Sequence, residues 1–173
     1  MTLLAGAVLV GVDNLRFSLA AGQLGLPRRR RHQLVAAFGL AEGLAPLAGV
    51  AATAPLATAL GRLADPLAAA ALLVAAALVL VPLVRGAGPA LPDSRWAVVL
   101  LPPLLALDNV AAGAGLRAFD LPLVPAALVM GVVSASIAAA GLLAGSAARR
   151  ILKGAGPLVA GLTLVAAAAV TLA

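Results

Sequence analysis

Gly11-Val12-Asp13-Asn14 interrupts a long apolar run near the start of the chain, and Ala106-Leu107-Asp108-Asn109 repeats its polar pair in a later run. Each pair lies about ten residues into its run, which predicts that each carboxylate lies near the middle of a membrane-spanning helix. A third carboxylate, Glu42, is predicted at the same depth in another apolar run. Charged groups at a bilayer midplane are unfavourable and usually serve a function.

The composition predicts an all-α integral membrane protein. Of the 173 residues, 64% are hydrophobic and 10% are charged. Apolar runs of about twenty residues recur, and each can span the hydrocarbon core as a helix. The lack of cysteine excludes disulfides and thiolate metal sites. The net charge of +6 is assigned to loops rather than to nucleic-acid binding, because the basic residues cluster between the apolar runs.

Six membrane helices are predicted, at about residues 3–24, 33–52, 65–84, 96–118, 121–147 and 156–173. The first is interpreted as a spanning helix rather than a cleaved signal peptide, because no positive charge precedes it and no convincing cleavage site follows. Residues 55–64 are predicted to form an interfacial connection. The domain organisation is then a first three-helix repeat at 1–84, a cytoplasmic linker at 85–95 and a second three-helix repeat at 96–173.

The basic residues are distributed unequally between the connections. Those after the second and fourth helices contain only Arg62 and Arg117. Positive residues stay on the cytoplasmic side, so we expect a multi-pass protein of the cell membrane with both termini outside. The Arg28–Arg31 run is interpreted as a topology signal, with binding of anionic lipid headgroups as a second interpretation. The connections after the first, third and fifth helices contain Arg28, Arg29, Arg30, Arg31, Arg85, Arg95, Arg149, Arg150 and Lys153.

The two Asp-Asn pairs indicate an internal repeat. A displacement of 95 residues superimposes Asp13 on Asp108, Asn14 on Asn109, and Pro27 on Pro122. Three predicted helices precede the linker and three follow it, and an odd number per repeat inverts the second copy in the membrane. The predicted fold is therefore six transmembrane helices as two inverted three-helix repeats. Transporters of this plan bind their substrate near the midplane, between the repeats.

The polar residues at this depth predict a metal site. Three carboxylates repel one another unless a cation or protons neutralise them, and the two asparagines add neutral oxygens. An oxygen-rich set without cysteine favours Mn²⁺, Mg²⁺ or Ca²⁺. For each carboxylate the alternative is an internal salt bridge or a helix–helix hydrogen bond. His32 is interpreted as a loop residue rather than a ligand. The predicted metal-site residues are Asp13, Asn14, Glu42, Asp108 and Asn109.

Neighbouring residues leave alternatives open. Arg16 lies one helical turn from Asp13 and is expected either to pair with it, which would weaken metal binding there, or to swing away. Ser134 and Ser136 are expected to face the interior at the depth of Glu42, with hydrogen bonding to their own helix as the alternative. Close helix packing is predicted at the small residues Gly113, Gly115, Gly131, Ala135 and Ala139.

The spacing of these residues resembles that of a known family, the MntP-type manganese exporters of the wider LysE superfamily. In the first half the matching residues are Asp13, Ser18, Gly39, Glu42, Pro46 and Gly49. In the second half they are Asp108, Gly113, Gly115, Gly131, Gly141 and Gly145. The residues after each Asp, and Arg16, differ from the family pattern, which has small residues there. The Asp-Asn pairs also resemble TerC-type membrane proteins.

The resemblance implies a secondary transporter that exports Mn²⁺ or a similar divalent cation from the cytoplasm by alternating access. Metal handling is implied for Asp13, Glu42 and Asp108, with the ion as transported substrate and no cofactor. No enzyme is predicted, because no nucleophile and base are visible together and the sequence has no nucleotide-binding loop. Expected partners are a divalent ion and membrane lipid but no nucleic acid, and a homo-oligomer is left open. The alternatives are a LysE-type exporter of amino acids or other small solutes, a TerC-like protein, and a non-transporting membrane scaffold.

Overall fold

The computed structural model describes residues 12–52, 54–116 and 123–172, and all regular secondary structure in these ranges is helical. The first part of the first predicted helix, residues 3–11, lies outside them. In chain order the elements are α2 (Val12–Gln23), α3 (Arg28–Ala51), α4 (Ala54–Val84), α5 (Arg95–Leu105), α6 (Leu107–Leu116), α7 (Leu123–Leu152), the 3₁₀ turn η2 (Lys153–Ala155) and α8 (Gly156–Thr171).

The long helices have the length and apolar character of membrane spans. Three helical stretches among the described residues qualify, namely Arg28–Ala51, Pro55–Val84 and Leu123–Thr171. Leucine and valine side chains such as Leu40, Leu128 and Val132 are exposed on the outside of the bundle. A surface of this kind suits contact with lipid rather than with water. The prediction of an all-α membrane protein is confirmed at this level.

Two predicted connections are helical in the structure. Residues 55–64, predicted as an interfacial connection, form the first part of α4. That prediction was wrong because Pro55 lies in the first turn, where proline is tolerated, and starts the helix instead of breaking it. The basic run Arg28–Arg31, predicted as a loop, forms the first turn of α3 directly after Pro27. The long helices therefore extend further than their apolar runs.

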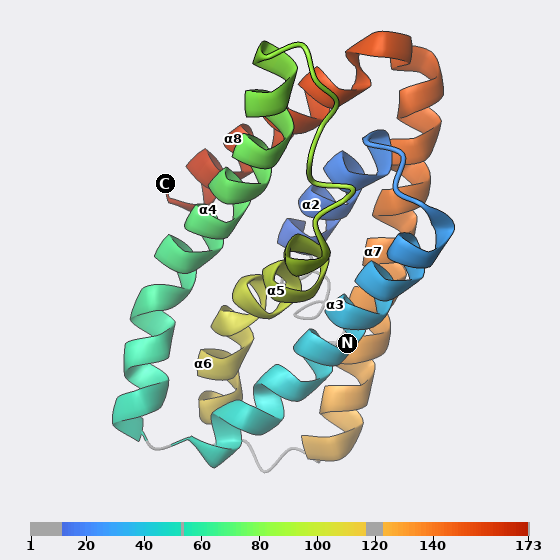
Figure 1. Cartoon of the computed structure of the whole chain (residues 1–173). Helices are drawn as coiled ribbons and strands as arrows, with labels where there is room; N and C mark the ends of the chain where they lie inside the picture. Colours follow the sequence, from blue (N-terminus) through green and yellow to red (C-terminus); the bar gives the residue numbers. More distant parts are fainter. Residues whose placement is uncertain (1–11, 53, 117–122, 173) are drawn as a thin grey trace.

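The predicted helix at 96–118 is divided into α5 and α6 at Ala106, which has φ −93° and ψ 6°. Pro102 and Pro103 lie just before this point. Proline has no N–H, so two hydrogen bonds to the preceding turn of α5 are lost. The bend between the two helices is visible in Figure 1. It places Asp108 and Asn109 in the first turn of a new helix, α6.

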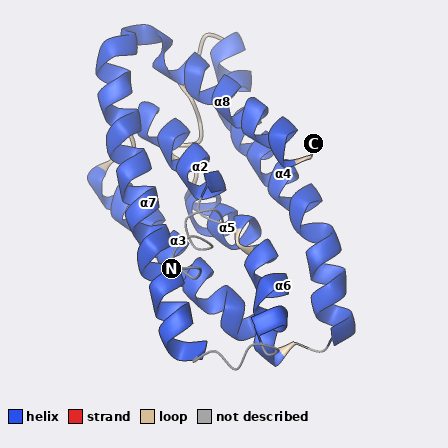
Figure 2. Ribbon diagram, turned by 180° about the vertical axis from the view of Figure 1, so that it is seen from behind, coloured by secondary structure: helices blue, strands red, loops and turns tan. Residues whose placement is uncertain are grey.

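The helices pack in a definite pattern of neighbours. Helix α2 packs on α7 and α8, α3 packs on α7, α5 and α6, and α4 packs on α8, α5 and α6. Figures 1 and 2 show α7 along one side of the bundle and α4 along the other. The α2–α3, α4–α5 and α7–α8 connections lie toward one end. The end of α3, the start of α4, the end of α6 and the start of α7 lie at the other end.

Glycines allow several helices to approach backbone to backbone. A Cβ added to Gly22 of α2 would lie 2.5 Å from the carbonyl oxygen of Leu142 and 3.0 Å from the Cα of Gly145, both on α7. A Cβ on Gly131 of α7 would lie 2.7 Å from the carbonyl oxygen of Gly39 on α3. These contacts exclude any larger residue without movement of the backbone. The predicted close packing at Gly131 is confirmed.

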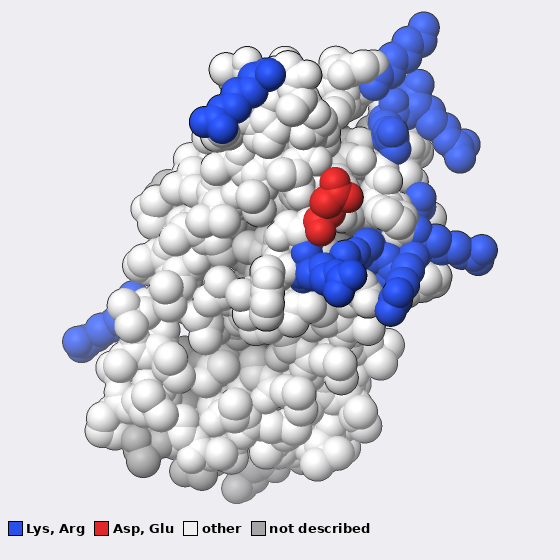
Figure 3. All heavy atoms as spheres, viewed as in Figure 1, with Lys and Arg blue, Asp and Glu red and all other residues white. Residues whose placement is uncertain are grey.

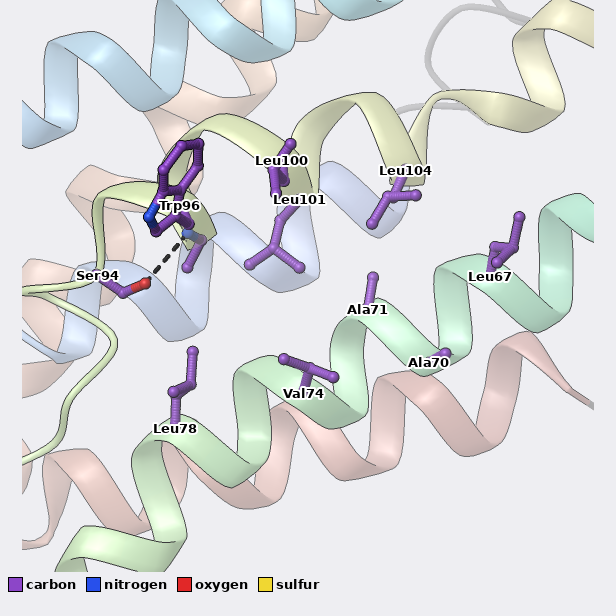
Figure 4. Close-up of a pocket in the computed structure, with 11 residues that line it drawn as sticks. Leu67, Ala70, Ala71, Val74, Leu78, Ser94, Trp96, Leu100, Leu101 and Leu104 are labelled. Atoms are coloured by element: carbon purple, nitrogen blue, oxygen red, sulfur yellow. Dashed lines mark hydrogen bonds between the residues drawn. The ribbon is translucent and has the colours of Figure 1, made fainter.

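An apolar cavity of about 330 Å³ lies between α4 and α5. Figure 4 shows Leu67 and Val74 of α4 facing Trp96 and Leu101 of α5 across it. The only hydrogen bond drawn there joins the backbone N–H of Ala97 to the hydroxyl of Ser94, at 3.2 Å, and caps α5. Such a lining offers no ligands for an ion, so the candidate site lies elsewhere.

Candidate functional site

Glu42 is the central group of the candidate site. It lies in the middle of α3 and is 2% exposed. Its Oε1 accepts a hydrogen bond of 2.7 Å from Nδ2 of Asn14, and its Oε2 accepts one from Nδ2 of Asn109. The asparagines of the two Asp-Asn pairs therefore bind the two oxygens of one carboxylate. Each asparagine is 1% exposed.

Four helices contribute to this cluster. Asn14 is in the first turns of α2, and its Nδ2 also donates to the hydroxyl of Ser134 on α7, at 2.8 Å. Asn109 is in the first turn of α6, immediately after the break at Ala106. A buried carboxylate is unfavourable unless hydrogen bonds or a cation compensate its charge. The two amide groups provide hydrogen bonds to Glu42, one on each oxygen.

The amide oxygens of the same asparagines accept no hydrogen bond from the described residues. Oδ1 of Asn14 and Oδ1 of Asn109 are buried and have no hydrogen-bond partner among the described residues. A buried polar atom without a partner is unfavourable by about 1–3 kcal/mol. Neutral amide oxygens next to a carboxylate are ligands that hard divalent cations accept. The cluster thus combines donors to Glu42 with two unused acceptors.

Asp13 is paired with a cation rather than with a residue of this cluster. Its Oδ1 accepts a hydrogen bond of 2.8 Å from Nη1 of Arg16, one turn further along α2. The side chains are 32% and 34% exposed, respectively, so the pair is half-buried. Of the two alternatives for Arg16, the structure has the paired one. The permanent positive charge of the guanidinium competes with a metal ion for this carboxylate.

Asp108 is exposed, and its Oδ1 accepts a hydrogen bond of 2.8 Å from the backbone N–H of Asn109. The charges of Asp108 and Asp13 both act on Glu42, so the three carboxylates lie within electrostatic range of one another. They do not form one compact ligand shell, because no group of three His, Cys, Asp or Glu residues in the described ranges is arranged to hold a metal. The structure thus joins Asn14, Glu42 and Asn109, with the two aspartates apart.

The two serines behave differently. Ser134 is buried and accepts from Asn14, as predicted. Ser136 is exposed and donates to the carbonyl oxygen of Val132 on its own helix, at 2.8 Å, so its predicted interior position was wrong. Helical residues two positions apart point about 200° away from each other, so both serines cannot face the same cluster. His32 is exposed in the second turn of α3.

Sequence reasoning missed one polar residue of this region. Gln23 is 3% exposed and its Oε1 has no partner among the described residues, but it lies at the far end of α2, beside Gly156 and about two and a half turns from Asn14. Ser18 has an equally unpaired hydroxyl and lies one turn from Asn14, but only the family resemblance singled it out. The available signal was the helical spacing of Asn14 and Ser18, which places both on one face of α2.

Residues 25–172 match the model of the family Mntp, which is described as "Putative manganese efflux pump". The matched stretch includes Glu42, Asp108 and Asn109, and it begins after Asp13 and Asn14. No curated protein and no solved structure matches the chain. The family match covers most of the chain and agrees with its apolar, membrane-spanning helices. The protein therefore belongs to the Mntp family of manganese efflux pumps.

Proposed function

We propose that this protein is a secondary transporter that exports Mn²⁺ or a similar divalent cation from the cytoplasm by alternating access. The observation that carries the proposal is the bridged carboxylate: Glu42 accepts one hydrogen bond from Asn14 and one from Asn109. Two asparagines from symmetric positions in the sequence meet on one buried acid. Inverted-repeat transporters bind their substrates at such a point between the repeats.

The helix contacts support two inverted repeats of three helices each. The proposal makes α2 equivalent to α5 with α6, α3 to α7, and α4 to α8. If each helix is replaced by its equivalent, the α2–α7 contact becomes the contact of α3 with α5 and α6. In the same way, the α2–α8 contact becomes the contact of α4 with α5 and α6. The α3–α7 and α4–α8 contacts exchange with themselves. The observed neighbours are thus unchanged by the exchange, as a two-fold axis in the membrane plane requires.

The charges at the site suit a divalent ion. Asp13 is neutralised by Arg16, whereas no ion pair to Glu42 or Asp108 occurs among the described residues. When both acids are deprotonated, two negative charges remain, which equal the charge of one divalent cation. Oxygen donors of the carboxylate and amide type favour Mn²⁺, Mg²⁺ or Ca²⁺ over softer metals. Two protons taken up in exchange would leave the same net charge.

The asparagines provide a way to exchange hydrogen bonds for metal ligands. In the structure their amide nitrogens bind Glu42 and their oxygens are unused. Rotation of an amide group by half a turn replaces Nδ2 with Oδ1. The same side chain then places its amide oxygen beside Glu42. This oxygen is attracted by a bound cation and repelled by the carboxylate when no cation is present. Asp108, exposed at the start of α6, is the second carboxylate that would join Glu42 on the ion.

Substitution of Glu42 by Gln tests this function directly. The amide keeps the shape of the side chain but removes the charge that binds the ion, so we expect loss of Mn²⁺ efflux and of manganese tolerance in cells that depend on this protein. Ser136→Ala is the matched control, because Ser136 is exposed and bonds only to its own helix. Wild-type efflux by Glu42→Gln, at equal protein levels, would refute the proposal.

A non-transporting scaffold is the second candidate, and the Asp13–Arg16 ion pair is the observation that favours it. In that case the buried polar groups serve only to hold helices together. Purified protein separates the two functions through its thermal stability in detergent. A transporter site is expected to raise the melting temperature with Mn²⁺, because an ion that binds only the folded state stabilises it. A scaffold would show no shift with Mn²⁺, Mg²⁺ or Zn²⁺.

A further inference from the structure

A basic cavity of about 480 Å³ lies at one end of the bundle, where the α2–α3 turn meets the end of α7. Figure 3 shows Lys and Arg side chains gathered along this side of the molecule. Four of the lining residues are cationic and none is acidic. The lining consists of Gly25, Arg31, Ser146, Arg149, Arg150 and Lys153. Four like charges around one cavity repel one another unless an anion lies between them.

Arg149 is exposed, but its side chain packs against the α2–α3 turn. Gly25 has φ +72°, a conformation that favours glycine, and a Cβ there would overlap the guanidinium of Arg149. A Cβ on Gly156 would lie 3.6 Å from Cγ of the same arginine. The side chain of Arg149 therefore packs between two glycines of different connections. The position of the Arg149 side chain is therefore more restricted than that of an arginine without packing contacts.

Two further cations are also constrained. Arg31 is half-buried, and its Nε donates to the carbonyl oxygen of Leu26 at 3.0 Å, which orients the guanidinium. Lys153 has φ +49°, the only positive φ among the non-glycine residues described. Lys153 directly follows the last residue of α7, where a left-handed residue often ends a helix, and this conformation is strained by about 1–3 kcal/mol for a residue other than glycine. The turn η2 thus holds Lys153 in an unfavourable conformation beside the cavity.

We propose that this basic cavity binds the phosphate of an anionic phospholipid headgroup. Guanidinium groups match the geometry of phosphate oxygens. The cavity lies at the start of α3 and the end of α7, where a membrane spanned by these helices would place its headgroups. A general excess of positive charge on one membrane side explains the sign of the residues. It does not explain their convergence on one cavity. Because Gly25 and Arg31 belong to the first half of the chain and the other four residues to the second, the headgroup joins the two halves.

The test measures lipid binding to the purified full chain in detergent by native mass spectrometry. The probe is phosphatidylglycerol, with phosphatidylcholine as the neutral comparison. We expect one phosphatidylglycerol to bind more tightly than phosphatidylcholine, and Arg149→Gln combined with Arg150→Gln to weaken this binding by roughly tenfold to thirtyfold. The matched control is Arg28→Gln with Arg29→Gln, which removes the same charge from the same end but from residues outside this cavity.

Three outcomes would overturn the proposal. Equal loss of binding in the control pair would mean diffuse attraction to the basic surface. Equal protection of the wild type against heat by inorganic phosphate and by phosphatidylglycerol would mean a site for free anions. Equal binding of both lipids by the wild type would mean no site. If the arginine pair does not fold, Lys153→Gln replaces it, because Lys153 is exposed, and weaker phosphatidylglycerol binding is again expected.

Discussion

The two Asp-Asn pairs are alike in their asparagines and unlike in their aspartates. Asn14 and Asn109 are equally buried, and each donates to one oxygen of Glu42. Asp13 is paired with Arg16, whereas Asp108 is exposed and has no cationic partner among the described residues. The difference shows that the aspartate of the first pair has a cationic partner, whereas the aspartate of the second pair has none among the described residues. We therefore expect that a cation bound at the proposed site would gain most from Asp108.

The largest effect on transport is expected for substitution of Asp108, and comparison with Asp13 tests the difference between the two aspartates. Asp108→Asn removes a carboxylate whose charge no cation among the described residues balances, so we expect Mn²⁺ transport to fall by about 100-fold or more, or about 2.7 kcal/mol. Asp13→Asn removes a carboxylate that binds Arg16 instead of the ion, so the decrease is expected to be smaller, and the unpaired Arg16 accounts for what remains of it. The measurement is Mn²⁺ efflux from vesicles containing each variant, with Asp93→Asn in the exposed linker as control. Equal effects of the two substitutions would contradict the asymmetry.

A second experiment tests the likeness of the asparagines. Asn14→Ala and Asn109→Ala each leave one oxygen of Glu42 without its donor, which is expected to lower the free energy of unfolding by about 1–3 kcal/mol. Asn14 also binds Ser134, so its substitution is expected to have the larger effect of the two. Thermal unfolding in detergent measures both. Ser134→Ala checks the extra hydrogen bond, and an effect of Asn109→Ala well above that of Asn14→Ala would argue against this assignment.

The smallest effect on stability is expected for Arg16→Gln. The ion pair with Asp13 is about one-third exposed, and pairs of this kind contribute about 0–1 kcal/mol. The substitution frees Asp13, however, so Mn²⁺ should bind more tightly. Isothermal titration of wild type and variant with Mn²⁺ measures this change. Unchanged affinity would mean that Asp13 takes no part in the site even when it is unpaired.

The sequence was sufficient to identify the polar residues of the site but not their arrangement. Depth in the apolar runs singled out Asn14, Glu42 and Asn109, because polar groups stand out against 64% hydrophobic residues. Spacing alone does not reveal which amide atom faces Glu42. That depends on the distance between helices, which is set by contacts such as that of Gly113 with Pro46. The roles of these residues as metal ligands stay a prediction.

The helix boundaries show the same limit. Pro102-Pro103 was visible in the sequence, yet a continuous helix at 96–118 was predicted, because proline bends some membrane helices without ending them. Pro55 started α4 rather than interrupting it. In both cases the effect of proline depends on whether neighbouring helices support a new start, which is a property of the packed bundle. Local helix spacing, by contrast, offered the Asp13–Arg16 pair as one of two alternatives, and the structure has this one.

The glycine contacts described above have a mechanical consequence. Gly22 meets Gly145, and Gly39 meets Gly131, between the two halves of the chain. Within the first half, Phe17 and Phe38 pack ring to ring with centroids 5.9 Å apart. Interlocked rings resist sliding because side chains must change rotamer, whereas smooth backbone surfaces shear with few such changes. Helices α2, α3 and α4 contact one another little, so most of the packing lies between the halves, and a small shear along these glycine contacts displaces one half against the other with few rotamer changes.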